Sequence, residues 1–122
     1  MKESGSFIVN TTVDVANGPI GGNARVYGKA QLKDSVSMKG ESEAYGECIL
    51  LNATRLENTA KVYGQANISG NSIINGNGRV YESAQVSNAT VTTNGRAHGN
   101  LILNSGILDF DLDYGIFGFL NL

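Results

Sequence analysis

The stretch ARVYGKAQLKDSVSMKGE, residues 24–41, contains three consecutive units of six residues with one internal pattern. Each unit has a small or β-branched residue, an apolar residue two positions later and a turn-forming residue two positions after that. In the first unit these residues are Ala24, Val26 and Gly28. Side chains two residues apart point to the same side of a β-strand. The stretch therefore predicts very short strands separated by tight turns.

The pattern continues in steps of six, without an insertion, as far as Asn88. Its apolar positions are Val26, Leu32, Met38, Ala44, Leu50, Leu56, Val62, Ile68, Ile74, Val80 and Val86. Its turn positions are Gly28, Asp34, Gly40, Gly46, Asn52, Asn58, Gly64, Gly70, Gly76, Glu82 and Asn88. Ten of these eleven are Gly, Asn or Asp, which tolerate a positive φ. A period of six does not fit an α-helix, so the sequence predicts an all-β repeat protein.

Composition excludes several classes of protein. The 122 residues suit one domain, and 16 Gly with a single Pro cannot make collagen. A net charge of −2 without a basic cluster argues against nucleic-acid binding. The sequence has no apolar run of membrane-spanning length and no signal-peptide pattern at its start, so we expect no membrane contact and a cytoplasmic location.

Units such as Val26-Tyr27-Gly28-Lys29-Ala30-Gln31 and Val62-Tyr63-Gly64-Gln65-Ala66-Asn67 resemble the hexapeptide repeat of left-handed parallel β-helices. The resemblance implies a single-stranded triangular solenoid in which three units form one coil of eighteen residues. The family includes the trimeric bacterial acyltransferases and many proteins without known activity. It also implies a homo-oligomer, with a trimer as the first expectation and a dimer as the alternative.

The chain is expected to be a single β-helix domain, residues 1–122, with a lead-in coil in residues 1–17 and hexapeptide coils in residues 18–106. In residues 107–122 apolar and acidic residues first alternate and then give way to an apolar end. The end of a solenoid exposes unpaired backbone, so this segment is expected to form a cap or a subunit contact. The residues expected in that contact are Phe110, Tyr114, Phe117, Phe119 and Leu120.

Two registers are open after Asn88. The unshifted register continues through Thr90, Thr92 and Asn94. A register slipped by one residue continues through Val91, Ala97 and Leu103. A slip would distort the last coil.

A coil of eighteen residues predicts that residues eighteen apart stack at about 4.8 Å. Four of the five tyrosines have this spacing: Tyr27, Tyr45, Tyr63 and Tyr81. A charged row runs beside them: Arg25, Glu43, Lys61 and Arg79. The other two faces carry the rows Gln31, Ile49, Asn67, Gln85 and Ser37, Arg55, Ile73, Val91. The tyrosines could serve stability alone, by cross-strand stacking, or recognition together with Arg25, Lys61 and Arg79.

Few residues could carry chemistry. The resemblance implies that a histidine would activate the acceptor in an acyltransferase, but no nearby acid is expected to orient His98, the only histidine. Cys48 lies in the small inward series, which favours a buried, inert thiol. One Cys and one His are too few for a zinc site. The spacing of Asp109, Asp111 and Asp113 is similar to the start of a calcium loop, but the intervening apolar residues favour an exposed strand face.

The sequence therefore favours a non-enzymatic solenoid that binds a protein or assembles with itself, with inhibition as one role. We expect it to need no cofactor and no metal. It would act through the Tyr/Arg row or the apolar C-terminal end. One alternative is a minimal trimeric acyltransferase that uses His98 and acyl-CoA. The second alternative is a structural filament.

Overall fold

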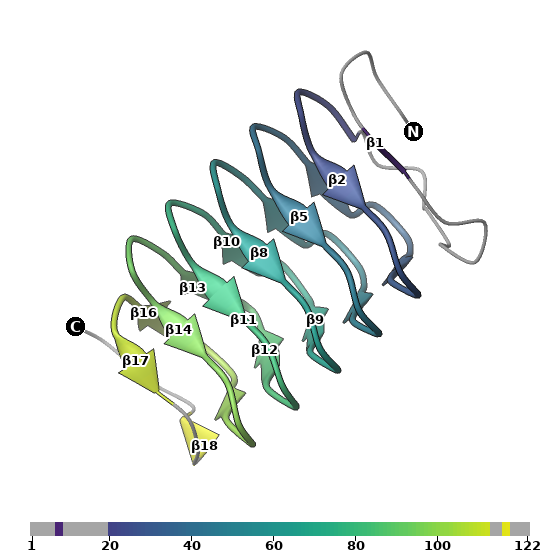
Figure 1. The fold of residues 1–122 in the computed structure, drawn as a ribbon. Coiled ribbons are helices and arrows are strands. Elements are labelled where there is room, and N and C mark those ends of the chain that lie inside the picture. The colour runs from purple at the N-terminus through teal and green to yellow at the C-terminus, as the bar shows by residue number, and fades with distance from the viewer. Residues whose placement is uncertain (1–6, 9–19, 113–115, 118–122) are drawn as a thin grey trace.

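The computed structural model describes residues 7–8, 20–112 and 116–117 of the chain. These residues form a parallel β-solenoid in which equivalent strands of successive coils stack beside one another (Figure 1). Every strand in the described ranges is two or three residues long, and those ranges contain no helix. The prediction of an all-β solenoid with eighteen residues per coil is confirmed, because Arg25 pairs with Glu43 and Glu43 with Lys61.

Three parallel sheets form the three sides of the solenoid. Sheet 1 contains β1 (Phe7–Ile8), β2 (Arg25–Val26), β5 (Glu43–Ala44), β8 (Lys61–Val62), β11 (Arg79–Val80), β14 (Arg96–Ala97) and β17 (Asp111–Leu112). Sheet 2 contains β3 (Gln31–Leu32), β6 (Ile49–Leu50), β9 (Asn67–Ser69), β12 (Gln85–Ser87), β15 (Ile102–Leu103) and β18 (Ile116–Phe117). Sheet 3 contains β4 (Ser37–Met38), β7 (Arg55–Leu56), β10 (Ile73–Ile74), β13 (Ala89–Val91) and β16 (Gly106–Leu108).

The core is the inward register that the sequence predicts. All eleven apolar positions from Val26 to Val86 are at most 2% exposed. Three of the small positions are polar and fully buried: Ser42, Thr54 and Ser72. Each of their hydroxyls donates a hydrogen bond of 2.8–2.9 Å to the carbonyl three residues earlier. The core therefore accepts polar side chains where a corner carbonyl satisfies them.

The corners of the coils lie at the turn positions that the sequence predicts. All eleven predicted positions have a positive φ, between 51° at Asn88 and 74° at Gly46. At Gly46 the close stacking of coils adds a second constraint, because a Cβ would lie 2.9 Å from the backbone nitrogen of Gly64. At Asn58 the side-chain oxygen accepts a 3.0 Å hydrogen bond from the backbone N–H of Gly76 in the next coil. A side-chain oxygen thus compensates for the strain of a positive φ at a residue other than glycine.

The register slips by one residue after Asn88. Ile73 pairs with Thr90 and Ile74 with Val91, a step of seventeen residues. The residues of the slipped register are fully buried: Val91, Ala97 and Leu103. The corner accommodates the slip, because Val86 and Val91 are five residues apart, whereas the equivalent core residues Ile68 and Ile74 of the preceding coil are six apart. The expected outward row of sheet 3 is therefore wrong at its last member: Thr90 follows Ile73, and Val91 faces the core.

The solenoid continues into the segment expected to be a cap. β16 pairs with β13, β17 with β14 and β18 with β15, so three strands extend the sheets beyond residue 105. Phe110 is 40% exposed. Phe117 belongs to β18, where it pairs with Leu103. Tyr114, Phe119 and Leu120 lie outside the described residues. Within the ranges that the structure describes, no helix has the length and apolar character needed to cross a bilayer.

Candidate functional site

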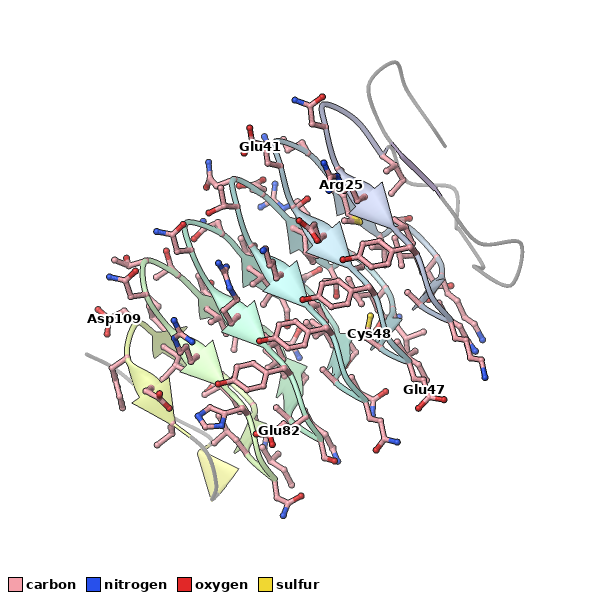
Figure 2. The ribbon with its side chains drawn as sticks, viewed as in Figure 1. Arg25, Glu41, Glu47, Cys48, Glu82 and Asp109 are labelled. Atoms are coloured by element: carbon pink, nitrogen blue, oxygen red, sulfur yellow. The ribbon has the colours of Figure 1, made fainter. Side chains whose placement is uncertain are left out.

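Sheet 1 carries a stack of aromatic rings along the solenoid axis. The ring centroids are 4.8 Å apart between Tyr27 and Tyr45, 5.0 Å between Tyr45 and Tyr63, and 4.9 Å between Tyr63 and Tyr81, with planes 2° apart (Figure 2). The predicted tyrosine row is thus confirmed. His98 extends it, with its ring 4.7 Å from that of Tyr81 and tilted by 6°.

The sequence pattern placed four residues in this row and missed the fifth. His98 follows Tyr81 by seventeen residues, the step that the slip after Asn88 produces. The sequence leaves two registers open after Asn88. Only the slipped register, through Val91 and Ala97, places His98 in the row.

The orientation of the rings determines what a partner can touch. Parallel rings at this spacing cover one another's faces, so each interior ring presents its edge to solvent. All five rings are half-buried. Stacking of a flat ligand on an interior ring is therefore blocked. The row offers a line of C–H edges and phenol hydroxyls, a surface that another protein can contact.

A row of charged residues lies beside the rings, one from each of the six strands of sheet 1 from β2 to β17. In order from β2 to β17 it contains Arg25, Glu43, Lys61, Arg79, Arg96 and Asp111. Glu43 interacts with two neighbouring side chains. Its Oε1 accepts a 2.9 Å hydrogen bond from the hydroxyl of Tyr27, and its Oε2 lies 3.9 Å from Nζ of Lys61. Burial, together with the bond to Glu43, raises the pKa of the Tyr27 phenol well above its usual value. Tyr27 therefore stays a neutral donor.

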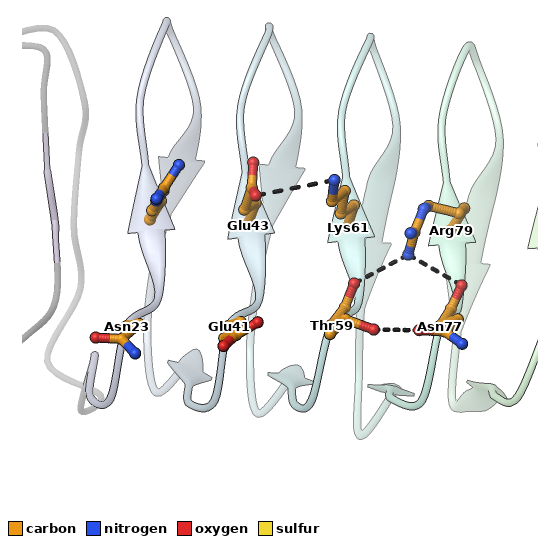
Figure 3. A pocket seen from close by; sticks show the side chains of 8 residues that line it. Asn23, Glu41, Glu43, Thr59, Lys61, Asn77 and Arg79 are labelled. Carbon is orange, nitrogen blue, oxygen red and sulfur yellow. Dashed lines mark hydrogen bonds and ion pairs between the residues drawn. The ribbon is translucent and has the colours of Figure 1, made fainter.

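The cations of this row fall into two groups. Nη1 of Arg79 donates to the carbonyls of Thr59 at 2.9 Å and Asn77 at 3.0 Å, so its guanidinium is turned toward the corner of the coil (Figure 3). Arg25 and Arg96 are exposed, and neither side chain has a hydrogen bond or ion pair with another residue in the described ranges. A polar groove runs between the charged row and the corner, lined by Asn23, Arg25, Glu41, Glu43, Thr59, Lys61, Asn77 and Arg79.

His98 lies between two carboxylates. Its Nδ1 is 3.1 Å from Oε1 of Glu82, and its Nε2 is 2.5 Å from Oδ1 of Asp111. The expectation that no acid orients His98 is wrong, because Glu82 comes from the preceding corner and Asp111 from the next strand of sheet 1. Burial lowers the pKa of His98, but the hydrogen bonds with Asp111 and Glu82 outweigh it, and the pKa is raised.

This arrangement bears on the chemistry open to His98. A general base needs a free imidazole nitrogen within reach of the proton that it removes. Both nitrogens of His98 are engaged by carboxylates, so in this arrangement neither faces an acceptor. Glu82 and Asp111 contact opposite nitrogens and do not converge with His98 on one point. Within the described ranges, no three His, Cys, Asp or Glu side chains are grouped to hold a metal ion.

Cys48 and the aspartates near the C-terminus are the other candidates for reactive or metal-binding side chains. Cys48 is fully buried, as expected, and burial raises the pKa of its thiol to about 12. Asp109 and Asp111 are exposed, and Asp111 is bonded to His98. Asp113 lies outside the described residues.

Compared with protein-family models, with curated proteins and with solved structures, the chain matches none of them.

Proposed function

We propose that the protein is a non-enzymatic module that contacts another protein surface through sheet 1, as a scaffold or an inhibitor, and that it is a member of the hexapeptide-repeat, left-handed β-helix type. The observation that carries the proposal is the pairing of two unbroken rows on one sheet. The ring row runs from Tyr27 to His98 and the charged row from Arg25 to Asp111.

The physical properties of this face support a contact role. The backbone N–H of Tyr45 donates a 3.0 Å hydrogen bond to the carbonyl of Val62, one of many such bonds that join each coil to the next. A surface fixed in this way loses little conformational entropy on binding. Tyr and Arg are enriched at the centres of protein interfaces, because they combine large contact area with hydrogen bonding.

The surroundings of His98 support a role without catalysis. An acyltransferase needs an imidazole nitrogen directed at the acceptor, and here both nitrogens are bonded to carboxylates. The histidine instead continues the ring row and joins the corner at Glu82 to β17 at Asp111.

The test compares a tyrosine-row variant, Tyr45→Ser with Tyr63→Ser, with a control on sheet 2, Asn67→Ser with Gln85→Ser. Proteins captured from the native host are compared by quantitative mass spectrometry, and circular dichroism verifies folding. We expect the tyrosine variant to lose partners that the control retains. An unchanged partner set would overturn the role of sheet 1. Calorimetric binding of acetyl-CoA that disappears in His98→Gln would overturn the non-enzymatic assignment.

A further inference from the structure

We infer that the partner of sheet 1 is a second copy of the same chain, packed antiparallel about a twofold axis, so that the two charged rows pair with each other. This inference rests on the proposed function, because it names the partner of the same face. It follows from the order of charges along the row and from the bonds that each charge makes within its own chain.

The geometry of the twofold arrangement is simple. A twofold axis that lies in the interface and perpendicular to the solenoid axis reverses the direction of one solenoid. Each axial row stays on the same lateral side, so ring row faces ring row and charged row faces charged row. Both copies share one axial repeat, given by the 4.8–5.0 Å spacing of the tyrosines. The rows therefore remain in step along the whole interface.

Full overlap of the six strands from β2 to β17 fixes which charges meet. Arg25 of one copy faces Asp111 of the other, and Glu43 faces Arg96. Each of these contacts occurs twice because the interface is symmetric. The two middle residues, Lys61 and Arg79, face each other.

The bonds within one chain fit this register. Lys61 and Arg79 meet as like charges, but each already has a partner within its own chain. Lys61 is paired with Glu43, and Arg79 donates hydrogen bonds to backbone carbonyls of the corner. Arg25 and Arg96 make no side-chain hydrogen bond or ion pair within the described part of the chain, and they are the two cations that would meet acids. Opposite charges thus face each other where a cation lacks a partner.

Other registers create more like-charge contacts and fewer opposite-charge contacts. A shift of one coil in one direction sets Arg25 against Arg96, and a shift in the other direction sets Glu43 against Asp111. A parallel twofold through the charged row sets every charge against its own copy. Like charges placed together in an interface are strongly unfavourable, so the full antiparallel overlap is the arrangement that the charges select.

The neighbouring rows tolerate this register. The residues two positions before the charged row form a corner row: Asn23, Glu41, Thr59, Asn77, Asn94 and Asp109. In the twofold arrangement Glu41 faces Asn94 and Thr59 faces Asn77, so no two acids meet. In the ring row Tyr63 faces Tyr81 and Tyr45 faces His98. These are contacts between ring edges and polar groups.

The experiment is sedimentation equilibrium of the full chain over a series of concentrations. We expect a monomer–dimer equilibrium that high salt weakens. Glu43→Lys alone and Arg96→Glu alone should each raise the dissociation constant at least about tenfold. The double variant with both substitutions should return it to within a few-fold of the original value. Positions 43 and 96 are three coils apart in one chain, about 15 Å, so the rescue has to act between copies.

The controls separate a broken interface from a misfolded chain. Arg55→Glu changes a charge on sheet 3 and should leave the dissociation constant unchanged. Glu43→Gln removes the charge with little change of shape and serves if Glu43→Lys does not fold. The inference is overturned by a monomer at every concentration, by a trimer, by a double variant that folds but is not rescued, or by an Arg55→Glu effect as large as that of Glu43→Lys. If the dimer fails but Tyr45→Ser with Tyr63→Ser still removes a captured partner, the proposed function survives.

Discussion

The coils before and after Asn88 have the same core but different surfaces. Where both strands of a pair lie between residues 20 and 87, they are eighteen residues apart, and the outward rows repeat one chemistry, as with Tyr27, Tyr45 and Tyr63. After Asn88 the step falls to seventeen, and between β14 and β17 it falls to fifteen. There the ring row changes to His98 and the charged row ends in an acid.

The comparison shows which part of the repeat tolerates change. Inside a strand, alternation decides which side chain is buried, so a slip there would exchange core and surface. The corners lie outside this alternation, and a residue can be lost between Ser87 and Ala89 while Ala89 and Val91 remain buried. The inward register is therefore the rigid feature of the fold, and corner length is the variable one.

The largest expected effect comes from the core. Leu56 lies in β7, between β4 and β10, whereas Leu108 lies in β16, which among the described strands of sheet 3 has only β13 as a neighbour. Both are fully buried. Leu56→Ala should lower the free energy of unfolding by about 3–5 kcal/mol, because coils on both sides hold the cavity open. Leu108→Ala should cost about 2 kcal/mol, because the end of the stack relaxes more easily. Urea denaturation measures both, and equal costs would contradict the comparison.

Corner glycines should come next. At Gly46, with a φ of 74°, a Cβ would lie 2.9 Å from the backbone nitrogen of Gly64, so Gly46→Ala should cost about 2–3 kcal/mol. Asn58, with a φ of 59°, is the matched position without glycine. Asn58→Gly relieves the strain but loses the hydrogen bond from Gly76, so we expect a change of less than about 1 kcal/mol. Thermal unfolding of the two variants tests this, and a cost at Asn58 as large as that at Gly46 would refute it.

Much of this fold could be predicted from sequence, because an apolar residue at the inward position and a turn-forming residue at the corner recur every six residues. Even Glu82, an unusual corner residue, has the expected positive φ of 56°. The slip could not be decided, because Thr90 and Val91 are both β-branched residues that can fill an inward position. The surroundings of His98 depend on the slip and on Asp111, which is thirteen residues from His98, a spacing that no period in the chain predicts.

A smaller effect is expected from the pH dependence at His98. Hydrogen bonds with Asp111 and Glu82 outweigh burial and raise the folded-state pKa of His98 above the usual value of about 6.5. The protonated imidazole therefore stabilises the fold fully below about pH 6.5, and this stabilisation is lost as the pH rises through the higher folded-state pKa. The single histidine gives one Cε1 proton resonance, so an NMR titration reads the pKa directly. A value at or below 6.5 would contradict the arrangement.

The matched variant is His98→Tyr, which continues the tyrosine row with a group that stays neutral near pH 7. The difference in Tm between the natural chain and this variant should decrease as the pH rises above about 6.5. His98→Gln removes both the charge and the ring, so the difference in Tm between His98→Tyr and His98→Gln reports on the ring. A Tm difference independent of pH would show that the ion pairs of His98 add nothing to the last coils.

The smallest effect is expected where the two regions meet. One glycine inserted between Asn88 and Ala89 gives this corner the length of the equivalent corner at Gly70 in the preceding coil. The equivalent corner of the following coil, at Ser105, then becomes the first shortened corner. The insertion moves the step by one coil and leaves the inward residues in place, so the free energy of unfolding should change by less than about 1 kcal/mol. The same glycine inserted between Lys61 and Val62 would turn the strand's core side chain outward and should cost several times more. Denaturant unfolding compares the two insertions, and similar losses would show that corner and strand are equally rigid.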